Sequence, residues 1–224
     1  MITISKRKAP CAAPAADNFH AARTAQWVMV ALSLVLLAGC GGKTPLLPRL
    51  GTGDVIVAFG DSLTYGTGAA ESESYPAVLA QLIGRGVVRS GVPGETTAQA
   101  LLRLPGVLDE HKPRLVIVCL GGNDMLRKLS EAETVSNLRA VVRKVKDGGA
   151  AVVLVGVPRP ALLTSAPKFY EEIAREFGIP YEGSVLTGVL YKPDLKSDTI
   201  HPNAAGYRKI AEAIAALLRK AGAV

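Results

Sequence analysis

The chain has 224 residues, of which 49% are hydrophobic and 20% charged, and its formal net charge is +7 at pH 7. This apolar content is sufficient for a buried core and excludes an intrinsically disordered chain. The basic residues do not gather among aromatic side chains, so the composition gives little support to nucleic-acid binding. We therefore expect a globular protein built around one domain.

The first 39 residues resemble an export signal more than part of a fold. Basic residues at positions 6–8 are followed by an apolar run, Trp27–Ala38, which is broken only by Ser33. The run is shorter than the roughly 20 residues of a transmembrane helix, but it suits the apolar core of a secretory signal. We expect residues 1–39 to be a signal peptide that is removed on export.

The apolar run ends in Leu37-Ala38-Gly39-Cys40. Small residues ahead of a cleavage point are usual in signal peptides, and a cysteine directly after them resembles the lipobox of bacterial lipoproteins. The resemblance implies lipid attachment at Cys40 and an anchor in a bacterial membrane, facing the periplasm or the cell exterior. The alternative is an ordinary secretory signal with an incidental cysteine. Residues 40–53 would then be the lipidated cysteine and a tether, and residues 54–224 the domain.

Cysteine usage in the mature chain is simple. Cys11 lies in the leader and Cys40 would carry lipid, which leaves Cys119 alone in the domain. We therefore expect no disulfide in the mature chain. Cys119 lies in an apolar run, where a buried packing residue is expected.

Apolar runs alternate with helical periodicities along the domain. In the helix expected from about residue 97, Ala98, Leu101 and Leu102 should face inward. Strands are predicted at residues 55–58, 86–90, 114–120, 151–157 and 179–181, and helices at residues 75–83, from about 97, 131–146, 169–177 and 204–220. Such alternation is typical of a parallel sheet that helices cover on both faces.

The predicted fold class is α/β, a three-layer α/β/α sandwich with a five-stranded parallel sheet of flavodoxin-like order. In this order the switch point lies between strands 1 and 3, and ligands bind at the carboxyl ends of the strands. Glycine-rich polar turns follow these two strands. Ser62 and Asn123 should therefore face one crevice, and Gly94 should border it.

A serine nucleophile needs a base, usually histidine, and the histidine needs an orienting carboxylate. His20 lies in the leader and His111 at a charged helix end, so His201 is the candidate base. Asp198, three residues earlier on a tight turn, could reach Nδ1 of His201 and leave Nε2 free to face Ser62.

Acyl transfer also needs hydrogen-bond donors for the oxyanion. The candidates are the backbone N–H groups of Ser62 and Gly94 and the side-chain amide of Asn123. A glycine lets the backbone approach a substrate closely, and an asparagine amide donates without carrying charge.

Four sequence blocks resemble those of the GDSL, or SGNH, hydrolases. They are Gly60-Asp61-Ser62, Gly94, Gly121-Gly122-Asn123-Asp124 and Asp198-Thr199-Ile200-His201. The likeness is greatest to the bacterial thioesterase I/lysophospholipase/arylesterase group. The resemblance implies Ser62 as nucleophile, His201 and Asp198 as the rest of a triad, and Ser62, Gly94 and Asn123 as the oxyanion hole.

The leading prediction is a serine esterase that cleaves carboxylic esters or thioesters through an acyl-Ser62 intermediate. No cofactor or metal is expected, and the substrate would be a small acyl ester or a lysolipid. The loop Pro158–Pro167 differs from the group and is a candidate lining of the acyl pocket. The chain has no Gly-x-Ser-x-Gly elbow, which argues against the α/β-hydrolase fold. Two alternatives remain: an envelope carbohydrate acetylesterase, and a non-catalytic envelope-binding lipoprotein.

Overall fold

Five parallel strands form the centre of the computed structural model, which describes residues 44–159 and 165–224. The sheet order is β2-β1-β3-β4-β5, which confirms the predicted fold class. The expected signal peptide and Cys40 lie outside the described residues. The strands are β1 (Ile56–Gly60), β2 (Val87–Gly91), β3 (Leu115–Cys119), β4 (Ala151–Val155) and β5 (Tyr181–Glu182).

The central strands are apolar along their whole length because both faces of the sheet are covered. Every residue of β1 and β3 is buried, and the two strands pair in register from Ile56 opposite Leu115. Cys119 ends β3 and is buried and unpaired, as predicted. Strand β2 lies at an edge and is half-buried throughout.

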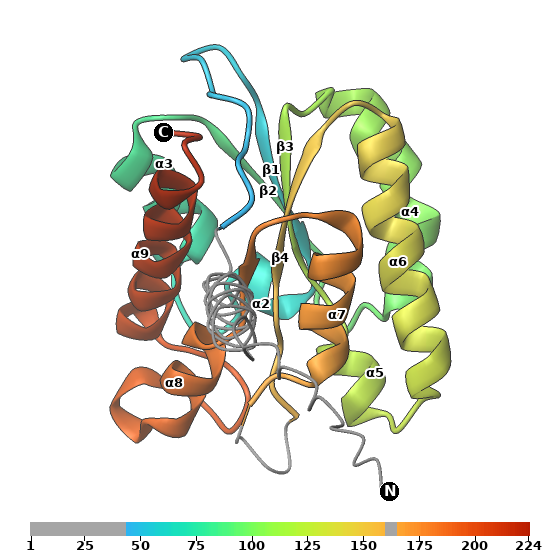
Figure 1. Cartoon of the computed structure of the whole chain (residues 1–224). Helices are drawn as coiled ribbons and strands as arrows, with labels where there is room; N and C mark the ends of the chain where they lie inside the picture. Colours follow the sequence, from blue (N-terminus) through green and yellow to red (C-terminus); the bar gives the residue numbers. More distant parts are fainter. Residues whose placement is uncertain (1–43, 160–164) are drawn as a thin grey trace, which may run out of the picture. The chain divides into compact units, whose positions relative to one another are not determined.

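Helices pack on both sides of this sheet (Figure 1), so the predicted three-layer arrangement is confirmed. Helix α3 packs against α9 on one side, and α4 packs against α6 on the other. No helix in the described part of the chain is both long and apolar enough to cross a bilayer. The longer helices are α3 (Tyr75–Ile83), α4 (Thr97–His111), α6 (Glu131–Asp147), α7 (Lys168–Phe177) and α9 (Ala204–Lys220). The short ones are α2 (Ser62–Tyr65), α5 (Gly122–Leu126) and α8 (Val185–Tyr191), with 3-10 turns η1 (Glu71–Glu73) and η2 (Pro193–Leu195).

Of the three residues expected to face inward on α4, only Leu101 packs against the core, where it is partly buried. Ala98 and Leu102 are exposed, Leu102 by 83%, whereas Ala100 and Leu104 are fully buried. Both sets have helical spacing, so periodicity alone could not choose between them. The rotation is fixed where the helix begins, because Thr97 is buried and donates from its backbone N–H to Asp124.

The second half of the predicted tether, residues 40–53, is part of the folded domain. The N–H of Leu47 donates to the carbonyl of Ala221 at 2.9 Å, and that of Leu50 to Ala223 at 2.8 Å. The Leu50 side chain is only 3% exposed. Backbone pairing with the chain after α9 and burial of Leu50 therefore hold this segment in place.

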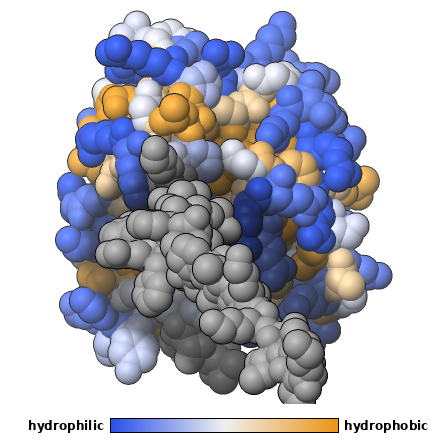
Figure 2. All heavy atoms as spheres, viewed as in Figure 1, coloured by the Kyte–Doolittle hydropathy of each residue, from blue (hydrophilic) through white to orange (hydrophobic). Residues whose placement is uncertain are grey.

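The face seen in Figure 2 is mostly covered by hydrophilic residues, and hydrophobic ones gather toward its upper part. Residues 46–48, 149–152 and 178–180 line a shallow apolar hollow near the start of β4 and β5. Because parallel strands start at one edge and end at the other, this hollow lies away from the edge where β1 and β3 end.

Candidate active site

Ser62 begins α2, two residues after Gly60 ends β1, and the chain turns sharply between the two elements. A Cβ at Gly60 would lie 2.2 Å from Oγ1 of Thr64 and 2.3 Å from the carbonyl oxygen of Cys119, so only glycine fits at this point. Asp61, between Gly60 and Ser62, caps α2, because its Oδ1 accepts the N–H of Leu63 at 3.0 Å. The turn thus fixes Ser62 at the carboxyl end of the sheet.

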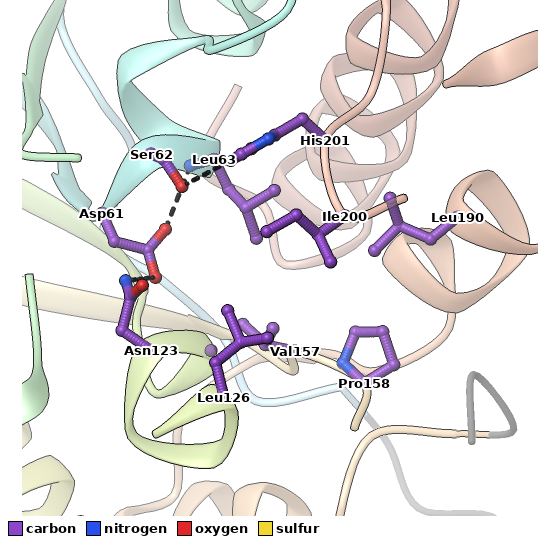
Figure 3. A pocket seen from close by; sticks show the side chains of 11 residues that line it. Asp61, Ser62, Leu63, Asn123, Leu126, Val157, Pro158, Leu190, Ile200 and His201 are labelled. Atoms are coloured by element: carbon purple, nitrogen blue, oxygen red, sulfur yellow. Dashed lines mark hydrogen bonds between the residues drawn. The ribbon is translucent and has the colours of Figure 1, made fainter. Parts of the chain in front are cut away.

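The structure brings Ser62, His201 and Asp198 together in one hydrogen-bonded line. Oγ of Ser62 lies 3.0 Å from Nε2 of His201 (Figure 3), and Nδ1 of His201 lies 2.8 Å from Oδ2 of Asp198. Ser62 and His201 are 139 positions apart in the sequence. The contact between Asp198 and His201 was expected from their spacing on one turn, whereas the contact between His201 and Ser62 joins two segments far apart in the sequence.

The turn before α9 holds Asp198 in place through its other oxygen. Oδ1 accepts the backbone N–H groups of Ile200 and His201, both at 2.8 Å. Burial acts to raise the pKa of Asp198, but these bonds and the His201 side chain outweigh it and lower the pKa overall. Asp198 is therefore ionised at neutral pH and accepts a hydrogen bond from Nδ1–H of His201, which leaves Nε2 to accept the hydrogen bond of the Ser62 hydroxyl.

Asn123 faces the same space from α5, which follows β3. Its amide nitrogen Nδ2 donates to the carbonyl oxygen of Glu95 at 2.9 Å and to Oδ2 of Asp61 at 3.3 Å (Figure 3). Both Asn123 and Ser62 line the pocket. Asn123 and Ser62 therefore face one pocket from the ends of two neighbouring strands.

Gly94 lies farther from the pocket than Asn123. It occupies the turn after β2 with a φ of +78°, a conformation that favours glycine, and it does not line the pocket. Among the described residues, no group accepts the backbone N–H of either Gly94 or Ser62. Both N–H groups are therefore available to a ligand oxygen.

Helix α5 is tied to the turn that carries Gly94. Nη2 of Arg127 donates to the carbonyl oxygen of Gly94 at 2.7 Å. Asp124, which is buried, accepts the backbone N–H of Thr97 at 2.9 Å and its hydroxyl at 2.6 Å. Together with the bond from Asn123 to Glu95, these contacts fix the two predicted donor segments relative to each other.

Asp61 is a buried acid that the sequence analysis did not assign to the site. Burial raises its pKa to about 7; the Leu63 N–H acts to lower it, and the nearby charges of Glu95 and Asp124 act to raise it. The carboxyl group lies between the Ser62 turn and the Asn123 amide. The sequence did contain one sign of its importance, since an acidic residue stands between a buried strand and the candidate serine. Its hydrogen bond with Asn123 became evident only from the fold.

The pocket beside Ser62 and His201 has mostly apolar walls, seen in Figure 3. Helix α8, which supplies Leu190, was not predicted, and Pro158 begins the loop that was expected to line the site. Residues 160–164 of that loop lie outside the described residues. The apolar lining is made by Leu63, Leu126, Val157, Pro158, Leu190 and Ile200.

Within the described residues, no group of three or more histidine, cysteine, aspartate or glutamate side chains is placed to hold a metal ion. The groups at the site are instead a hydroxyl, an imidazole, a carboxylate and amide donors. This set can carry out acyl transfer by a serine nucleophile with its own acid–base chemistry.

The sequence model of the GDSL-like lipase/acylhydrolase family matches residues 58–209, a span that includes Ser62, Asn123, Asp198 and His201. The chain belongs to this family. It is an SGNH-type serine esterase, which confirms the enzyme class predicted from the four sequence blocks. The family resemblance stated above is likewise confirmed, including the likeness to the thioesterase I and arylesterase group.

Several relatives are similar to this chain over most of their length. The thioesterase 1/protease 1/lysophospholipase L1 of Escherichia coli K12 is 33% identical over 186 residues, covering 80% of this chain and 85% of that protein. The esterase TesA of Pseudomonas aeruginosa is 31% identical and covers 80% and 94%. The arylesterase of Vibrio mimicus is 32% identical and covers 74% and 88%.

Solved structures show the same fold. The crystal structure of TesA superimposes with a TM-score of 0.67 at 28% identity, covering 75% of this chain and 99% of that one. AlinE4, an SGNH-hydrolase family esterase, has a TM-score of 0.58 at 34% identity, covering 77% and 98%. The sheet order described above is therefore that of this family.

Proposed function

We propose that Ser62 is the nucleophile of a two-step ester hydrolysis, with His201 as general acid–base and Asp198 as its orienting carboxylate. The observation that carries the proposal is the continuous line of hydrogen bonds, 3.0 Å from Ser62 to His201 and 2.8 Å from His201 to Asp198. Nε2 takes the hydroxyl proton as Oγ attacks the acyl carbon. The same nitrogen then returns the proton to the leaving alcohol or thiol.

The acyl group is then bound to Ser62 as an ester, and water completes the cycle. Nε2 of His201 accepts a proton from the water molecule, whose oxygen attacks the acyl carbon. Oγ leaves with the proton from His201, and the carboxylic acid is released. Each of the two tetrahedral intermediates carries an oxyanion that needs hydrogen-bond donors.

The oxyanion would be held by the N–H groups of Ser62 and Gly94 and by Nδ2 of Asn123. The two N–H groups have no acceptor among the described residues, and the Asn123 amide makes one short bond and one long one. The long bond, 3.3 Å to Asp61, is the weaker of the two and is the one an oxyanion can share or replace.

The substrate would be a carboxylic ester or thioester whose acyl part enters the apolar pocket. Leu126, Val157 and Leu190 contribute hydrocarbon surface to that pocket. Among its described lining residues, the only ionisable groups are His201 and the buried carboxyl group of Asp61. The names of the relatives, a thioesterase/lysophospholipase and an arylesterase, support this class of substrate. We therefore include thioesters, aryl esters and lysophospholipids among the proposed substrates.

Hydrolysis of p-nitrophenyl esters from acetyl to palmitoyl tests this proposal on the full chain. Ser62→Ala should abolish turnover at every chain length and leave the melting temperature nearly unchanged, because Oγ of Ser62 bonds only to His201 among the described side chains. Ser136→Ala, at an exposed position on α6, is the matched control and should keep full activity. Retention of most activity by Ser62→Ala contradicts the mechanism.

We also propose that Cys40 carries lipid and anchors the protein to a bacterial membrane, facing the periplasm or the cell exterior. The support is the sequence Leu37-Ala38-Gly39-Cys40 after an apolar run with a basic start. Cys40→Ser should move the protein from the membrane fraction to the soluble fraction, while Cys11→Ser in the leader should leave it in the membrane. Unchanged membrane association of the Cys40 variant would refute the anchor.

A further inference from the structure

Exposed large apolar side chains gather at the end of the molecule that carries the active site. Seven such side chains are exposed among the described residues, and five of them belong to segments that follow the carboxyl ends of strands. The other two, Leu46 and Leu102, lie before β1 and on the outer face of α4. The five, which we call the rim, are Tyr65, Val92, Leu126, Leu129 and Tyr191.

The rim lies at the same end of the sheet as the catalytic pocket and reaches it at Leu126. Leu126 itself lines the pocket, and Tyr191 directly follows Leu190, which lines the opposite wall. Tyr65 ends α2, the helix that Ser62 begins, and Val92 follows the edge strand β2. Because the strands are parallel, all these segments meet at one edge of the sheet. The rim and the site therefore lie at the same edge of the sheet.

Cations lie between and beside the apolar residues of the rim. Arg127 and Lys128 separate Leu126 from Leu129, and Lys192 follows Tyr191. Within the described residues, no carboxylate lies within ion-pair distance of these three cations. The free charge next to the exposed apolar side chains is therefore positive.

Some carboxylates at this end already have cationic partners. Glu131 pairs with Arg159 and Glu71 with Arg89, whereas Asp198 bonds to the imidazole of His201. Asp194 on η2 is the exposed carboxylate nearest in sequence to Lys192 that makes no ion pair in the described chain. Glu73 and Glu133, also exposed at this end, likewise make no ion pair among the described residues, so the positive charge of the rim is local to the cations next to its apolar side chains.

Single exposed apolar residues need no explanation, but a group of them at the mouth of an esterase pocket does. Apolar side chains that enter the headgroup region, with lysine and arginine reaching the phosphates, are the usual components of a surface that lies on a lipid bilayer. Cations near an anionic bilayer add an attraction that salt weakens. The rim has both components.

We propose that the rim docks onto the surface of an anionic phospholipid bilayer, so that a single-chain amphiphilic ester passes from that surface directly into the pocket. The proposal rests on the function proposed above, since it places Ser62 over the lipid. Leu129 and Tyr191 enter the headgroup region, and Lys128 and Lys192 contact lipid phosphates. Docking by the rim fixes which end of the domain faces the membrane.

The test uses the full chain reconstituted with vesicles and a tryptophan placed at one position at a time. Leu129→Trp and Tyr191→Trp report on the rim, and Leu102→Trp on α4 is the matched control. Vesicles contain phosphatidylcholine and phosphatidylglycerol with a nitroxide-labelled lipid as quencher. The signal of the unsubstituted chain, whose one tryptophan is Trp27, is subtracted. Quenching at positions 129 and 191 should be several-fold stronger than at position 102.

Charge is tested by a double variant, Lys128→Glu with Lys192→Glu, and by salt. Both should reduce quenching at position 129, and p-nitrophenyl acetate hydrolysis in solution should be unchanged in the double variant. Equal quenching at positions 129, 191 and 102 overturns the proposal. Quenching that is as strong on pure phosphatidylcholine as on anionic vesicles overturns its electrostatic part. Loss of ester hydrolysis with rim quenching retained would refute the proposed function and leave the docking surface standing.

Discussion

The side-chain amide of Asn123 donates to the carboxylate of Asp61 at 3.3 Å, which links the loop after β3 to the residue that precedes Ser62. The same nitrogen donates to the carbonyl oxygen of Glu95 at 2.9 Å. One amide therefore joins the segments that follow three strands of the sheet, and its orientation is set before any substrate binds. Such preorganisation is what makes oxyanion donors effective.

Removing this amide should affect the reaction more than the fold. Asn123→Ala is expected to lower kcat by about 10²–10³ if the amide stabilises the oxyanion. Steady-state kinetics on a p-nitrophenyl ester would measure this. Asn137→Ala is the control, because Asn137 donates to Oγ1 of Thr97 on α4 and does not line the pocket. An unchanged kcat in Asn123→Ala removes that residue from the oxyanion hole.

The buried Asp61 should make stability depend on pH. Burial raises its pKa from 3.8 to about 7, so over this range the folded protein holds a proton that the unfolded chain has released. The protonated Asp61 makes its full contribution to the free energy of unfolding below the unfolded-state pKa of 3.8. This stabilisation is lost as the pH rises from the unfolded-state pKa of 3.8 through the folded-state pKa of about 7, at up to about 1.4 kcal/mol per pH unit.

Asp61→Asn should remove this dependence. The stability of the variant relative to wild type is expected to increase between about pH 4 and pH 7, as measured by urea unfolding at a series of pH values. Asp109→Asn, at an exposed position on α4, should follow the wild-type curve. Parallel curves for Asp61→Asn and wild type would show that Asp61 is ionised in the folded protein throughout this range.

Asp198→Asn should slow turnover while the domain stays folded. An amide in place of the carboxylate can donate to Nδ1, which puts the imidazole proton on Nε2, where it cannot accept the proton of Ser62. We expect a loss in kcat of roughly 10³–10⁴ with a small change in melting temperature. Asp194→Asn on η2 serves as the control. A loss below tenfold would show that Asp198 does not orient His201.

The turn between β1 and α2 should not tolerate a side chain at position 60. In Gly60→Ala the new methyl group would meet the carbonyl oxygen of Cys119, a backbone atom that cannot move aside. We expect a loss of about 1–3 kcal/mol in stability, or more, measured by chemical unfolding. Gly106→Ala in α4 has no atom within 4 Å of the new methyl group and should gain up to about 1 kcal/mol. Equal effects at both positions would contradict this account.

Much of the fold could be predicted because its signals are local. The apolar runs of β1 and β3 and the apolar face of α9 each identify an element without reference to the rest of the chain. The alternation of strands with helices indicated a parallel sheet, and the flavodoxin-like order expected for it is the one observed. The short helix α8 had no such signal, because its seven residues are too few to show a period.

The contacts in the candidate site were likewise predictable from sequence only where they are local. Asp198 and His201 are three residues apart on one turn, so their contact could be predicted from spacing. The pairing of Asp61 with Asn123 could not, because the two residues are 62 positions apart and both follow strand ends whose exact termination depends on packing. The inward face of α4 was predicted wrongly for Ala98 and Leu102 for a related reason: tertiary hydrogen bonds from the N–H and hydroxyl of Thr97 to Asp124 fix the start of the helix.

The sequence by itself determined the class of fold, the family and the identity of the candidate nucleophile and base, since these depend on local patterns and on a few residue types in a fixed order. Only the tertiary structure decided which side chains share a space: the apolar pocket walls, the buried carboxyl group of Asp61, the docking of Leu47 and Leu50 against the chain end, and the exposed rim. Burial and long-range contact are properties of the packed chain, because each depends on atoms contributed by segments far apart in the sequence.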